Sequence, residues 1–556
     1  MIRAASSDAA APTVPDPQNT DRIVRLVPSC VFLALCAWLF AADARANGQP
    51  WGFPLDDAWI HMTFGRNLAC GVGFSVNAGE PSGASTSVLW SLWLGILHLL
   101  PATWGLAAVI AAVKASGIAL GLAAIAGVHR FLRAAGCSSG ETLIGSLMTL
   151  GAYPLAWAAL SGMEVPLTCA LCAWALALQL EAAAVPSGRR RAAAVFLWTL
   201  AVLARPENAV LLVLAIFLLW REDRGSGWRG AVRLVVTALP VIAAYVAFLL
   251  YLCGKPWPTT LEAKMSATAL PLLIREGNWA GLPAALAGVG GTLGDVLSFL
   301  LGENCIVLAV LFLVPGLIYI IRDSSGGAWA RVAAFAWLAL PLQAVLVALV
   351  AAPESYTAFH GRYLAHTLWI AAPGGFLVAA AAWRWYGRPR WIWIAIGIGL
   401  VAMGDRQIDL ARVYPLETAN ITNLQVRIAR WFGESLRGGG PVAINDVGAM
   451  GYFSGRRLID LEGLITPEAI SWNRSGRIDV FIREQRPEFV LIFPYWYPEI
   501  VARLDVFRPL LRFAIERNIT GGGEELVLFG MPWTPPRTEP WPPWPTPGLP
   551  ERVPVP

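Results

Sequence analysis

Residues 51–90 read WGFPLDDAWIHMTFGRNLACGVGFSVNAGEPSGASTSVLW and follow directly on the first strongly apolar segment of the chain. Asp56 and Asp57 lie where the chain leaves that segment, and Glu80 follows in a loop rich in Gly and Ser. The residues between these acids predict a short amphipathic helix, roughly 58–69. A polar stretch between apolar segments has to lie at a membrane interface or line a water-filled cavity. The simpler alternative is an interfacial loop with solvated carboxylates.

The composition of the chain is that of a membrane protein. Of its 556 residues, 56% are hydrophobic and only 14% are charged, whereas a soluble protein carries about 25% charged residues. The net charge of +5 is small and no basic patch indicates a nucleic-acid partner. We therefore expect an α-helical polytopic membrane protein whose partner is the lipid bilayer.

Two kinds of connection alternate between the apolar segments. One kind is basic, as at Arg130 with Arg133 and at 189–191. By the positive-inside rule these connections lie in the cytoplasm and the others lie outside. The others carry four short motifs: SGME (161–164), RPEN (205–208), GKPWPTTLEAK (254–264) and PESYTAFHGRY (353–363).

Segment 85–100 decides the parity of the crossings. If it crossed the bilayer, every later basic connection would lie outside, so we expect it to dip into the membrane or lie along the interface. About eleven transmembrane helices then remain, with the C-terminal region external. The apolar pieces on either side of RPEN, 192–204 and 208–220, are shorter than the usual span of roughly 17–25 residues, which predicts a broken helix or tight hairpin lining a cavity.

After residue 404 the composition changes. Charged residues return, and the apolar runs shorten to strand length at 441–446 and 489–496, with a helix expected at 419–436. This alternation predicts a small α/β domain. The chain thus divides into a disordered cytoplasmic N-terminus (1–20), a transmembrane domain (21–404, with long external loops at 43–84 and 254–301), a soluble periplasmic α/β domain (405–532) and a Pro-rich tail (533–556).

The predicted topology gathers ionisable groups on one face of the bundle. A transporter would place such groups near the midplane, in paired halves, and the sequence has no internal repeat. A one-sided cavity suits chemistry between a lipid-anchored molecule and a molecule outside the membrane. The groups are Asp56, Asp57, Arg66, Glu80, Glu164, Arg205, Glu207, Lys264, His360 and Arg362.

Several stretches, in this order, resemble the GT-C fold polytopic glycosyltransferases, in particular the mycobacterial terminal arabinofuranosyltransferases and their bacterial relatives. They are DDAWIHMTFGRNLACGVGFSVNAGE, SGMEVPL, LARPEN, GKPWPTTLEAK, HGRYL and DVGAMGYFSGRRLIDLEGLI, which together span roughly residues 25–470. The resemblance implies transfer of a sugar from a polyprenyl-phosphate donor to an acceptor glycan, glycolipid or protein. It also implies work on the periplasmic face of a bacterial inner membrane.

The resemblance places the general base in the acidic pair, Asp56 or Asp57, with a small preference for Asp56. A carboxylate there can take the proton of an acceptor hydroxyl as the new bond forms. The phosphate leaving group needs cationic partners, for which Arg205, Lys264 and Arg362 are the candidates and His360 an additional donor.

The remaining candidates would bind substrate: Arg66, Glu80, Glu164, Glu207 and Asp446. Alternatively, Glu164 and Glu207 pair with the cations, and Asp446 caps a Gly-rich turn. We expect His61 and His98 at apolar or interfacial positions rather than in the site.

No metal is predicted as a required cofactor. Asp56, Asp57 and Glu80 carry the oxygen ligands that Mg²⁺ or Mn²⁺ takes, but the sequence has no cluster that demands a metal. Two departures from the family pattern leave the donor sugar open: 257–260 reads WPTT where Leu-Pro-Asn-Thr is usual, and Trp59 stands where Tyr is common.

Two other classes of function compete with the glycosyltransferase. One is a transporter or flippase of lipid-linked glycans. The other is a non-catalytic membrane scaffold that presents a carbohydrate-binding domain. An enzyme should lose turnover when either acid of the pair is replaced, whereas a scaffold should not respond.

Overall fold

The computed structural model describes residues 17–223, 227–266, 268–302, 328–350, 357–385, 391–436, 439–536 and 540–542. Most of the expected disordered N-terminus and most of the Pro-rich tail lie outside the described residues. So does nearly all of 302–321, an apolar segment counted among the predicted transmembrane helices. Helix α1 begins at Pro17, so residues 17–20 are helical where disorder was expected.

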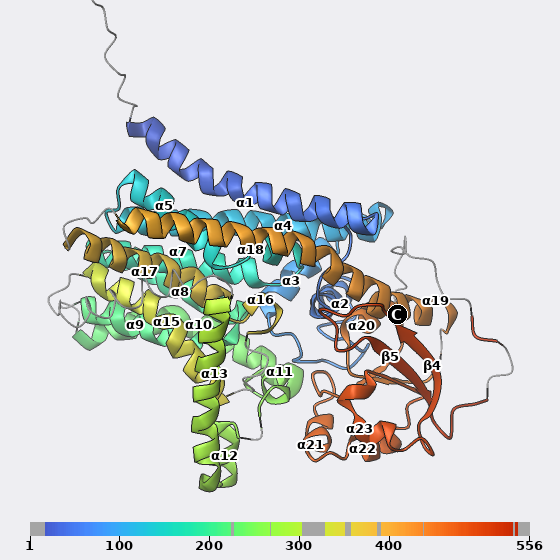
Figure 1. The fold of residues 1–556 in the computed structure, drawn as a ribbon. Helices are drawn as coiled ribbons and strands as arrows, with labels where there is room; N and C mark the ends of the chain where they lie inside the picture. Colours follow the sequence, from blue (N-terminus) through green and yellow to red (C-terminus); the bar gives the residue numbers. More distant parts are fainter. Residues whose placement is uncertain are drawn as a thin grey trace, which may run out of the picture.

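Long helices form a bundle with the sheet domain at one end (Figure 1). The main helices are α1 (Pro17–Asn47), α4 (Gly105–Ala134), α5 (Ser139–Ala152), α7 (Val165–Ala184), α8 (Gly188–Ala204), α9 (Ala209–Glu222), α10 (Gly227–Cys253), α15 (Ala328–Val350), α17 (Ala365–Trp385) and α18 (Trp391–Ile421). Among the described residues, six stretches are long and apolar enough to cross a membrane. The chain is therefore a multi-pass membrane protein, as the composition predicts. These stretches are Leu26–Asn47, Ala102–Ala134, Val165–Ala184, Gly227–Cys253, Trp279–Leu300 and Arg331–Val350.

The basic connections meet one another away from the motifs. Arg130, at the end of α4, pairs with Glu181 at the end of α7 at 2.6 Å. Arg191, at the start of α8, pairs with Asp223 after α9 at 2.7 Å. These pairs bring together helix ends that carry none of the four motifs, so the two kinds of connection lie at opposite ends of the bundle, as the alternation predicts.

Segment 85–100 folds as the short helix α3 (Val88–Leu97). Ten residues of helix span about 15 Å, half of the roughly 30 Å hydrocarbon thickness, so α3 is too short to cross the membrane. It packs against α2 (Asp57–Ala69), the amphipathic helix predicted after the acidic pair. Gly65 makes this contact close, because a Cβ at that position would lie 2.8 Å from Leu94 Cβ.

The segment 254–301, expected as the second long external loop, is largely helical. It contains α11 (Thr259–Ala263), α12 (Leu270–Glu276) and α13 (Leu282–Gly302), and the last is one of the stretches apolar enough to span a membrane. Small Gly and Ala residues keep its mean hydropathy near 1.3, which hides it from a reading of apolar runs. In Figure 1, α13 lies crosswise to the long helices of the bundle.

The domain boundary expected at 404/405 falls inside α18. The helix continues to Ile421 and is followed by a π-helical turn, η5 (Thr422–Val426), and by α19 (Arg427–Ser435). The charged residues that return after residue 404 do not end the helix, and α18 continues through Pro415, so a continuous helix joins bundle and domain.

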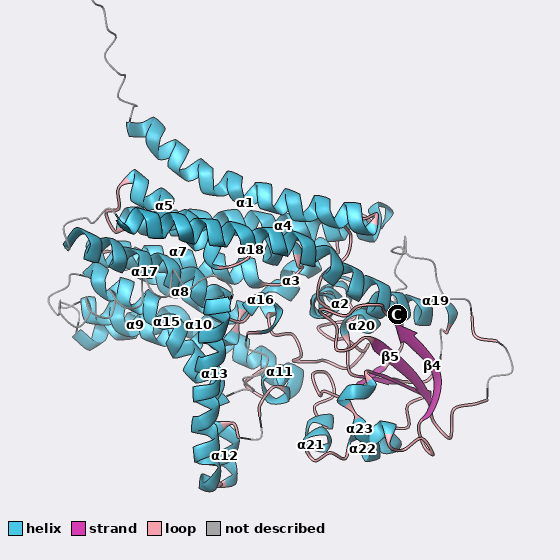
Figure 2. Ribbon diagram, in the orientation of Figure 1, coloured by secondary structure: helices cyan, strands magenta, loops and turns pink. Residues whose placement is uncertain are grey.

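The domain contains a five-stranded sheet in the order β2-β1-β3-β5-β4 (Figure 2). Strands β1 (Val442–Ile444), β2 (Leu458–Asp460) and β3 (Phe489–Ile492) are parallel, with Ala443 opposite both Ile459 and Val490. Strands β4 (Arg508–Ala514) and β5 (Glu525–Gly530) run antiparallel at the other edge. The strands expected at 441–446 and 489–496 correspond to β1 and β3.

Alternate strand residues face two different cores. Val490 and Ile492 pack with Phe481 of α22 (Ile478–Gln485) in a core confined to the domain. Phe489 and Leu491 belong to the large core that continues into the bundle. This alternation of period two seats the sheet directly on the helical end that carries the motifs.

Candidate active site

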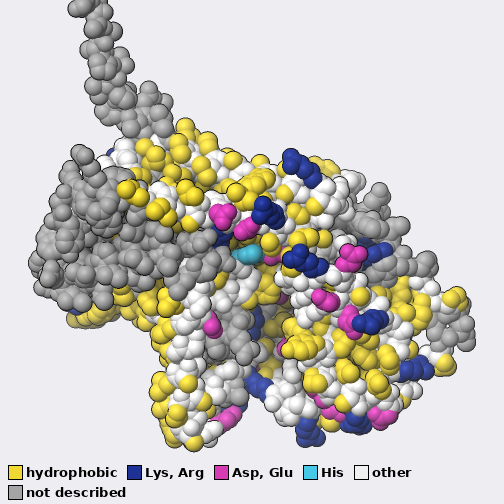
Figure 3. Space-filling view, in the orientation of Figure 1, with side chains coloured by type: hydrophobic (Ala, Val, Ile, Leu, Met, Phe, Trp, Pro, Cys, Tyr) yellow, Lys and Arg dark blue, Asp and Glu magenta, His cyan; other side chains and the backbone are white. Residues whose placement is uncertain are grey.

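A cavity of about 390 Å³ lies where the motif end of the bundle meets the sheet domain. Charged side chains gather toward this junction, whereas the described bundle surface is largely apolar (Figure 3). The cavity brings together most of the predicted site residues from segments far apart in sequence. They are Asp56, Asp57, Glu164, Arg205, Lys264, Arg362 and Asp446.

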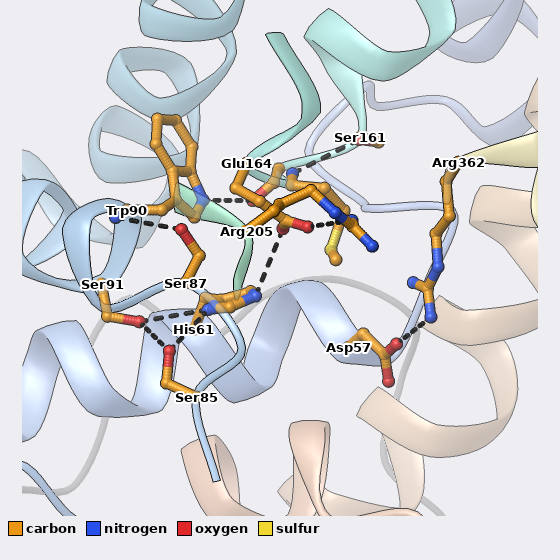
Figure 4. A network of polar contacts seen from close by, with 12 residues as sticks. Asp57, His61, Ser85, Ser87, Trp90, Ser91, Ser161, Glu164, Arg205 and Arg362 are labelled. Atoms are coloured by element: carbon orange, nitrogen blue, oxygen red, sulfur yellow. Dashed lines mark hydrogen bonds and ion pairs between the residues drawn. The ribbon is translucent and has the colours of Figure 1, made fainter. Parts of the chain in front are cut away.

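Asp57 and Arg362 form an ion pair across the cavity wall (Figure 4). Asp57 opens helix α2, and its side chain keeps 39% of its surface accessible. Burial would raise the pKa of the Asp57 carboxyl, but the charges of Arg362 and Lys264 outweigh burial and lower it. Asp57 is therefore an ionised carboxylate that faces the cavity.

Arg362 follows a strained turn. Helix α16 (Ala358–Gly361) contains Phe359 and His360 at φ of 52° and 58°, a left-handed conformation that is costly for residues with a side chain. The guanidinium is only 3% exposed, and its Nη2 also donates to the Tyr363 hydroxyl at 2.8 Å. Its Nε and Nη1 have no hydrogen-bond partner among the described residues. Buried donors normally have partners, so these two donors set the Arg362 guanidinium apart from the paired Arg205.

Tyr363 is the centre of a cationic cluster. Its ring lies 4.9 Å from the Arg205 guanidinium, 4.8 Å from that of Arg362 and 5.1 Å from the Lys264 ammonium. The ammonium donates to the Tyr363 hydroxyl at 2.8 Å. Burial would raise the pKa of this hydroxyl, yet Arg362 and Lys264 lower it. Sequence reasoning missed Tyr363, although it ends the quoted motif HGRY.

Arg205 is held between two carboxylates. Its Nη1 donates to Glu164 at 2.6 Å and its Nε to Glu207 at 2.6 Å. Glu207 does not line the cavity. Glu164 and Glu207 therefore pair with a cation, as the alternative to substrate binding predicts.

His61 also belongs to this network, contrary to expectation (Figure 4). Its Nε2 lies 3.4 Å from Glu164, and its Nδ1 lies 3.1 Å from the Ser91 hydroxyl. Burial would raise the pKa of Glu164, but His61 and Arg205 hold it well below the usual range. The sequence could have predicted this position, because His61 follows Asp57 by four residues and so lies on the same face of α2.

Asp56 turns to the sheet domain. Its two carboxylate oxygens accept hydrogen bonds from the backbone N–H of Gly448 at 2.8 Å and of Ala449 at 2.9 Å. A Cβ at Gly448 would lie 2.1 Å from the Asp56 carbonyl oxygen, so this contact requires glycine. Burial and the nearby Asp446 raise the pKa of the Asp56 carboxyl. Asp56 joins the first external segment to the domain.

Besides Glu207, three predicted site residues lie outside the cavity, each with partners inside the chain. Arg66 is 8% exposed and donates to Tyr452 O and, at 2.7 Å, to Asn67 Oδ1. The substrate contact expected for Arg66 is therefore not supported.

Glu80 pairs with Arg457 at the surface at 2.6 Å, and His360 Nε2 lies 2.8 Å from Glu417. The separation of Glu80 from Asp56 and Asp57 removes the oxygen cluster considered for a divalent ion. Within the described ranges, no three His, Cys, Asp or Glu residues form a group that could hold a metal ion.

Other cavity residues were not predicted. Trp496, which is 44% exposed, and Glu462 line the side that belongs to the sheet domain. The Trp496 indole donates to Gly522 O at 2.7 Å. These residues come from loops after strands, whose approach to the bundle depends on the assembled tertiary structure.

Comparison with known proteins identifies the fold. A family model described as a domain of unknown function (DUF8728) matches residues 419–528. No curated protein matches the chain in sequence. The oligosaccharyltransferase AglB from Archaeoglobus fulgidus, in complex with an inhibitory peptide and a dolichol-phosphate, is similar in structure with a TM-score of 0.51 and 10% identity over 91% of this chain and 75% of that chain.

Two further structures are similar. The A. fulgidus oligosaccharyltransferase in complex with Zn and sulfate has a TM-score of 0.50 and 12% identity over 82% of this chain and 67% of its own. Apo ArnT from Cupriavidus metallidurans has a TM-score of 0.46 and 12% identity over 90% of this chain and 97% of its own. The mycobacterial arabinofuranosyltransferases are not among these structures. The chain has a GT-C fold, with a bundle of transmembrane helices and a small C-terminal sheet domain.

Proposed function

We propose that the chain is a membrane glycosyltransferase that moves a sugar from a polyprenyl-phosphate donor to an acceptor hydroxyl. The observation that carries this proposal is the pairing of an open carboxylate, Asp57, with a cluster of cations in one cavity. Two donors of the Arg362 guanidinium in that cluster lack a partner among the described residues. The GT-C fold, shared with a protein seen with dolichol-phosphate, supports the same class of donor.

The donor phosphate binds at Arg205, Lys264 and Arg362. Arginine makes bidentate contacts to phosphate, and lysine adds a point charge. As the bond between the anomeric carbon and the phosphate oxygen breaks, its electron pair leaves with polyprenyl phosphate, and these cations stabilise the added negative charge. The acceptor oxygen forms the new bond to the anomeric carbon and passes its proton to a carboxylate.

We assign the base to Asp57 rather than to Asp56. Both Asp56 oxygens accept backbone N–H groups, and its side chain is buried against the domain. Asp57 has a single ion-pair partner and faces the cavity. When the donor phosphate draws on Arg362, Asp57 loses part of its neutralising partner and becomes a better proton acceptor. Asp56 then positions the loop, and the earlier preference for it is reversed.

The wider setting follows from the same proposal. The cavity lies at the end of the bundle away from the basic connections, which we place in the cytoplasm by the positive-inside rule. The sheet domain would then face the periplasm of a bacterium and the acceptor would be a glycan, glycolipid or protein on that side. No metal is required, because the cationic cluster can serve the phosphate.

The test uses the full chain in nanodiscs with a panel of polyprenyl-phosphate sugars and mixed acceptor glycans. We expect one donor to release polyprenyl phosphate, and Asp57→Asn to abolish this release. The matched variant Asp56→Asn should retain more activity. Binding of a lipid-linked glycan without release from any donor, unchanged in both variants, would overturn the enzyme and favour the transporter.

A further inference from the structure

A second cavity, of about 250 Å³, lies where the end of α1 meets α18 and the π-helical turn η5. None of its lining residues lines the active-site cavity. Its volume is just below the roughly 300–1,000 Å³ of typical ligand pockets, which suits a single ring rather than a long chain. The polar residues that line it include Asp43, Gln49, Trp51, Thr418, Thr422 and Asn423.

Asp43 supplies a buried carboxylate to this cavity. Its side chain is fully buried, and its Oδ1 accepts from Asn47 Nδ2 and from Thr418 Oγ1, both at 2.6 Å. Its Oδ2 has no hydrogen-bond partner in the part of the chain that the structure describes. A buried carboxylate oxygen is costly without a donor, so this oxygen calls for a donor from a molecule outside the chain.

Another part of the cavity wall is the π-helical turn η5. Short π-helical turns are rare and are frequent at functional sites, because they aim side chains where an α-helix would not. Here the turn supplies Thr422 and Asn423 to the cavity. Gly52 allows the close approach, since a Cβ at that position would lie 2.7 Å from Thr422 Oγ1.

The chemistry of the lining favours a neutral ligand. The carboxylate of Asp43 lies within electrostatic range of the Lys114 ammonium, which donates to Pro50 O at 2.9 Å and compensates its charge. Amides and hydroxyls, which both donate and accept, complete the wall. An aromatic ring, Trp51, stands beside them and packs edge-on against Phe40 at 5.9 Å. Mixed donors and acceptors around an aromatic ring match a ring that carries many hydroxyls.

We propose that this cavity binds one neutral sugar residue, with Asp43, Thr422 and Asn423 at its hydroxyls and Trp51 against its apolar face. Gln425 of the same turn, and Ile421 directly before it, line the active-site cavity. The second sugar site and the active-site cavity therefore share this stretch of backbone. It goes beyond the proposed transfer reaction and requires none of its chemistry.

The test measures sugar binding alone. The full chain in nanodiscs is titrated with methyl glycosides of neutral hexoses and pentoses, and saturation-transfer difference NMR gives the apparent Kd. We expect at least one glycoside to bind, and Trp51→Ala and Thr422→Val each to weaken it about tenfold or more. Asn423→Ala changes an exposed residue and serves as the variant least able to disturb folding. It should weaken binding as well.

Controls separate this site from the active site and from lipid headgroups. Trp496→Ala, in the first cavity, should leave the glycoside Kd within twofold. Loss of binding in Trp496→Ala but not in Asn423→Ala would overturn the proposal, as would absence of binding by every glycoside. Glycerol or ethanolamine displacing the glycoside at equal concentration would identify a headgroup site and also overturn it. Because no transfer is measured, failure here is independent of failure of the glycosyltransferase.

Discussion

The cations that line the active-site cavity all come from the bundle wall, where they stand beside the carboxylates of Asp57 and Glu164. The bundle wall presents Arg205, Lys264 and Arg362 around Tyr363, whereas the wall from the sheet domain presents Asp446 and Glu462. Burial and neighbouring acids raise the pKa of Asp446 to about 6, while the cations lower that of Asp57 across the cavity. The difference suggests a division of labour, in which an anionic leaving group is drawn to the bundle and an uncharged hydroxyl lies against the domain.

Replacing Asp57 with Asn should have the largest effect on the rate of transfer. It removes the carboxylate that faces the cavity beside Arg362, and general-base catalysis is worth about 10²–10⁴-fold in rate. We expect a loss of that order in polyprenyl-phosphate release.

The matched change, Asp56→Asn, leaves an acceptor for one of the two backbone N–H groups. It should lower the free energy of unfolding by about 1–3 kcal/mol with a smaller loss of rate. Thermal unfolding and initial rates, measured side by side, separate the two acids. The reverse pattern would return the base to Asp56.

Arg362→Ala tests the cationic wall. Hydrogen bonds to charged groups contribute about 1.5–3 kcal/mol, so the affinity for polyprenyl phosphate should fall roughly ten- to hundredfold. Calorimetric titration with polyprenyl phosphate, without any sugar, measures this directly. Arg457→Ala, which removes an exposed pair with Glu80, should leave the affinity unchanged. Equal losses in both variants would mean that general surface charge, and not the cluster, attracts the lipid.

Much of this arrangement could be predicted from the sequence. The acidic pair, the motif connections and their common face follow from hydropathy and charge, and the apolar runs at β1 and β3 follow from local composition. Each of these depends on residues close together in the chain.

What could not be predicted depends on distant residues. Asp57 and Arg362 are separated by 305 positions, and only the folded bundle shows that they pair. Asp56 has helical dihedrals, at φ −63° and ψ −34°, and leads directly into helix α2. Asp56 and Asp57 have different partners because successive residues of a helix are turned by about 100°. The partners of Asp56 lie in the sheet domain, nearly 400 residues further along the chain. Helix α13 was missed because its small residues dilute its hydropathy.

Tyr363→Phe sharpens the description of the cationic wall with a smaller effect. The hydroxyl accepts from both Lys264 and Arg362, and it holds two like charges near one point. Loss of a neutral hydrogen-bonding group costs about 0.5–1.5 kcal/mol, so we expect KM for the donor to rise about three- to tenfold with kcat less affected. Tyr495→Phe, on a side chain that is 91% exposed, is the control and should change neither constant.

The acidic wall makes its own prediction through Asp460. This fully buried residue ends β2, and its carboxylate accepts from the backbone N–H of Glu462 and of Ile465, both at 2.9 Å, which shapes the turn that lines the cavity. Burial raises its pKa from 3.8 to about 7. Between these values the folded chain keeps a proton that the unfolded chain has lost.

The stability that this proton contributes is fully present below pH 3.8 and is lost as the pH rises through about 7. The melting temperature of the native chain should therefore fall between pH 5 and pH 8, and Asp460→Asn, which cannot ionise, should fall less. The pKa of Asp446 is also raised, so the melting temperature of Asp460→Asn should still fall in part over this pH range. Asp409→Asn, on a side chain that is 63% exposed, should decline like the native chain. If the melting temperature of Asp460→Asn fell as much as that of the native chain, the domain wall would owe its stability to packing rather than to a retained proton. The two walls would then differ only in the number of their charged groups.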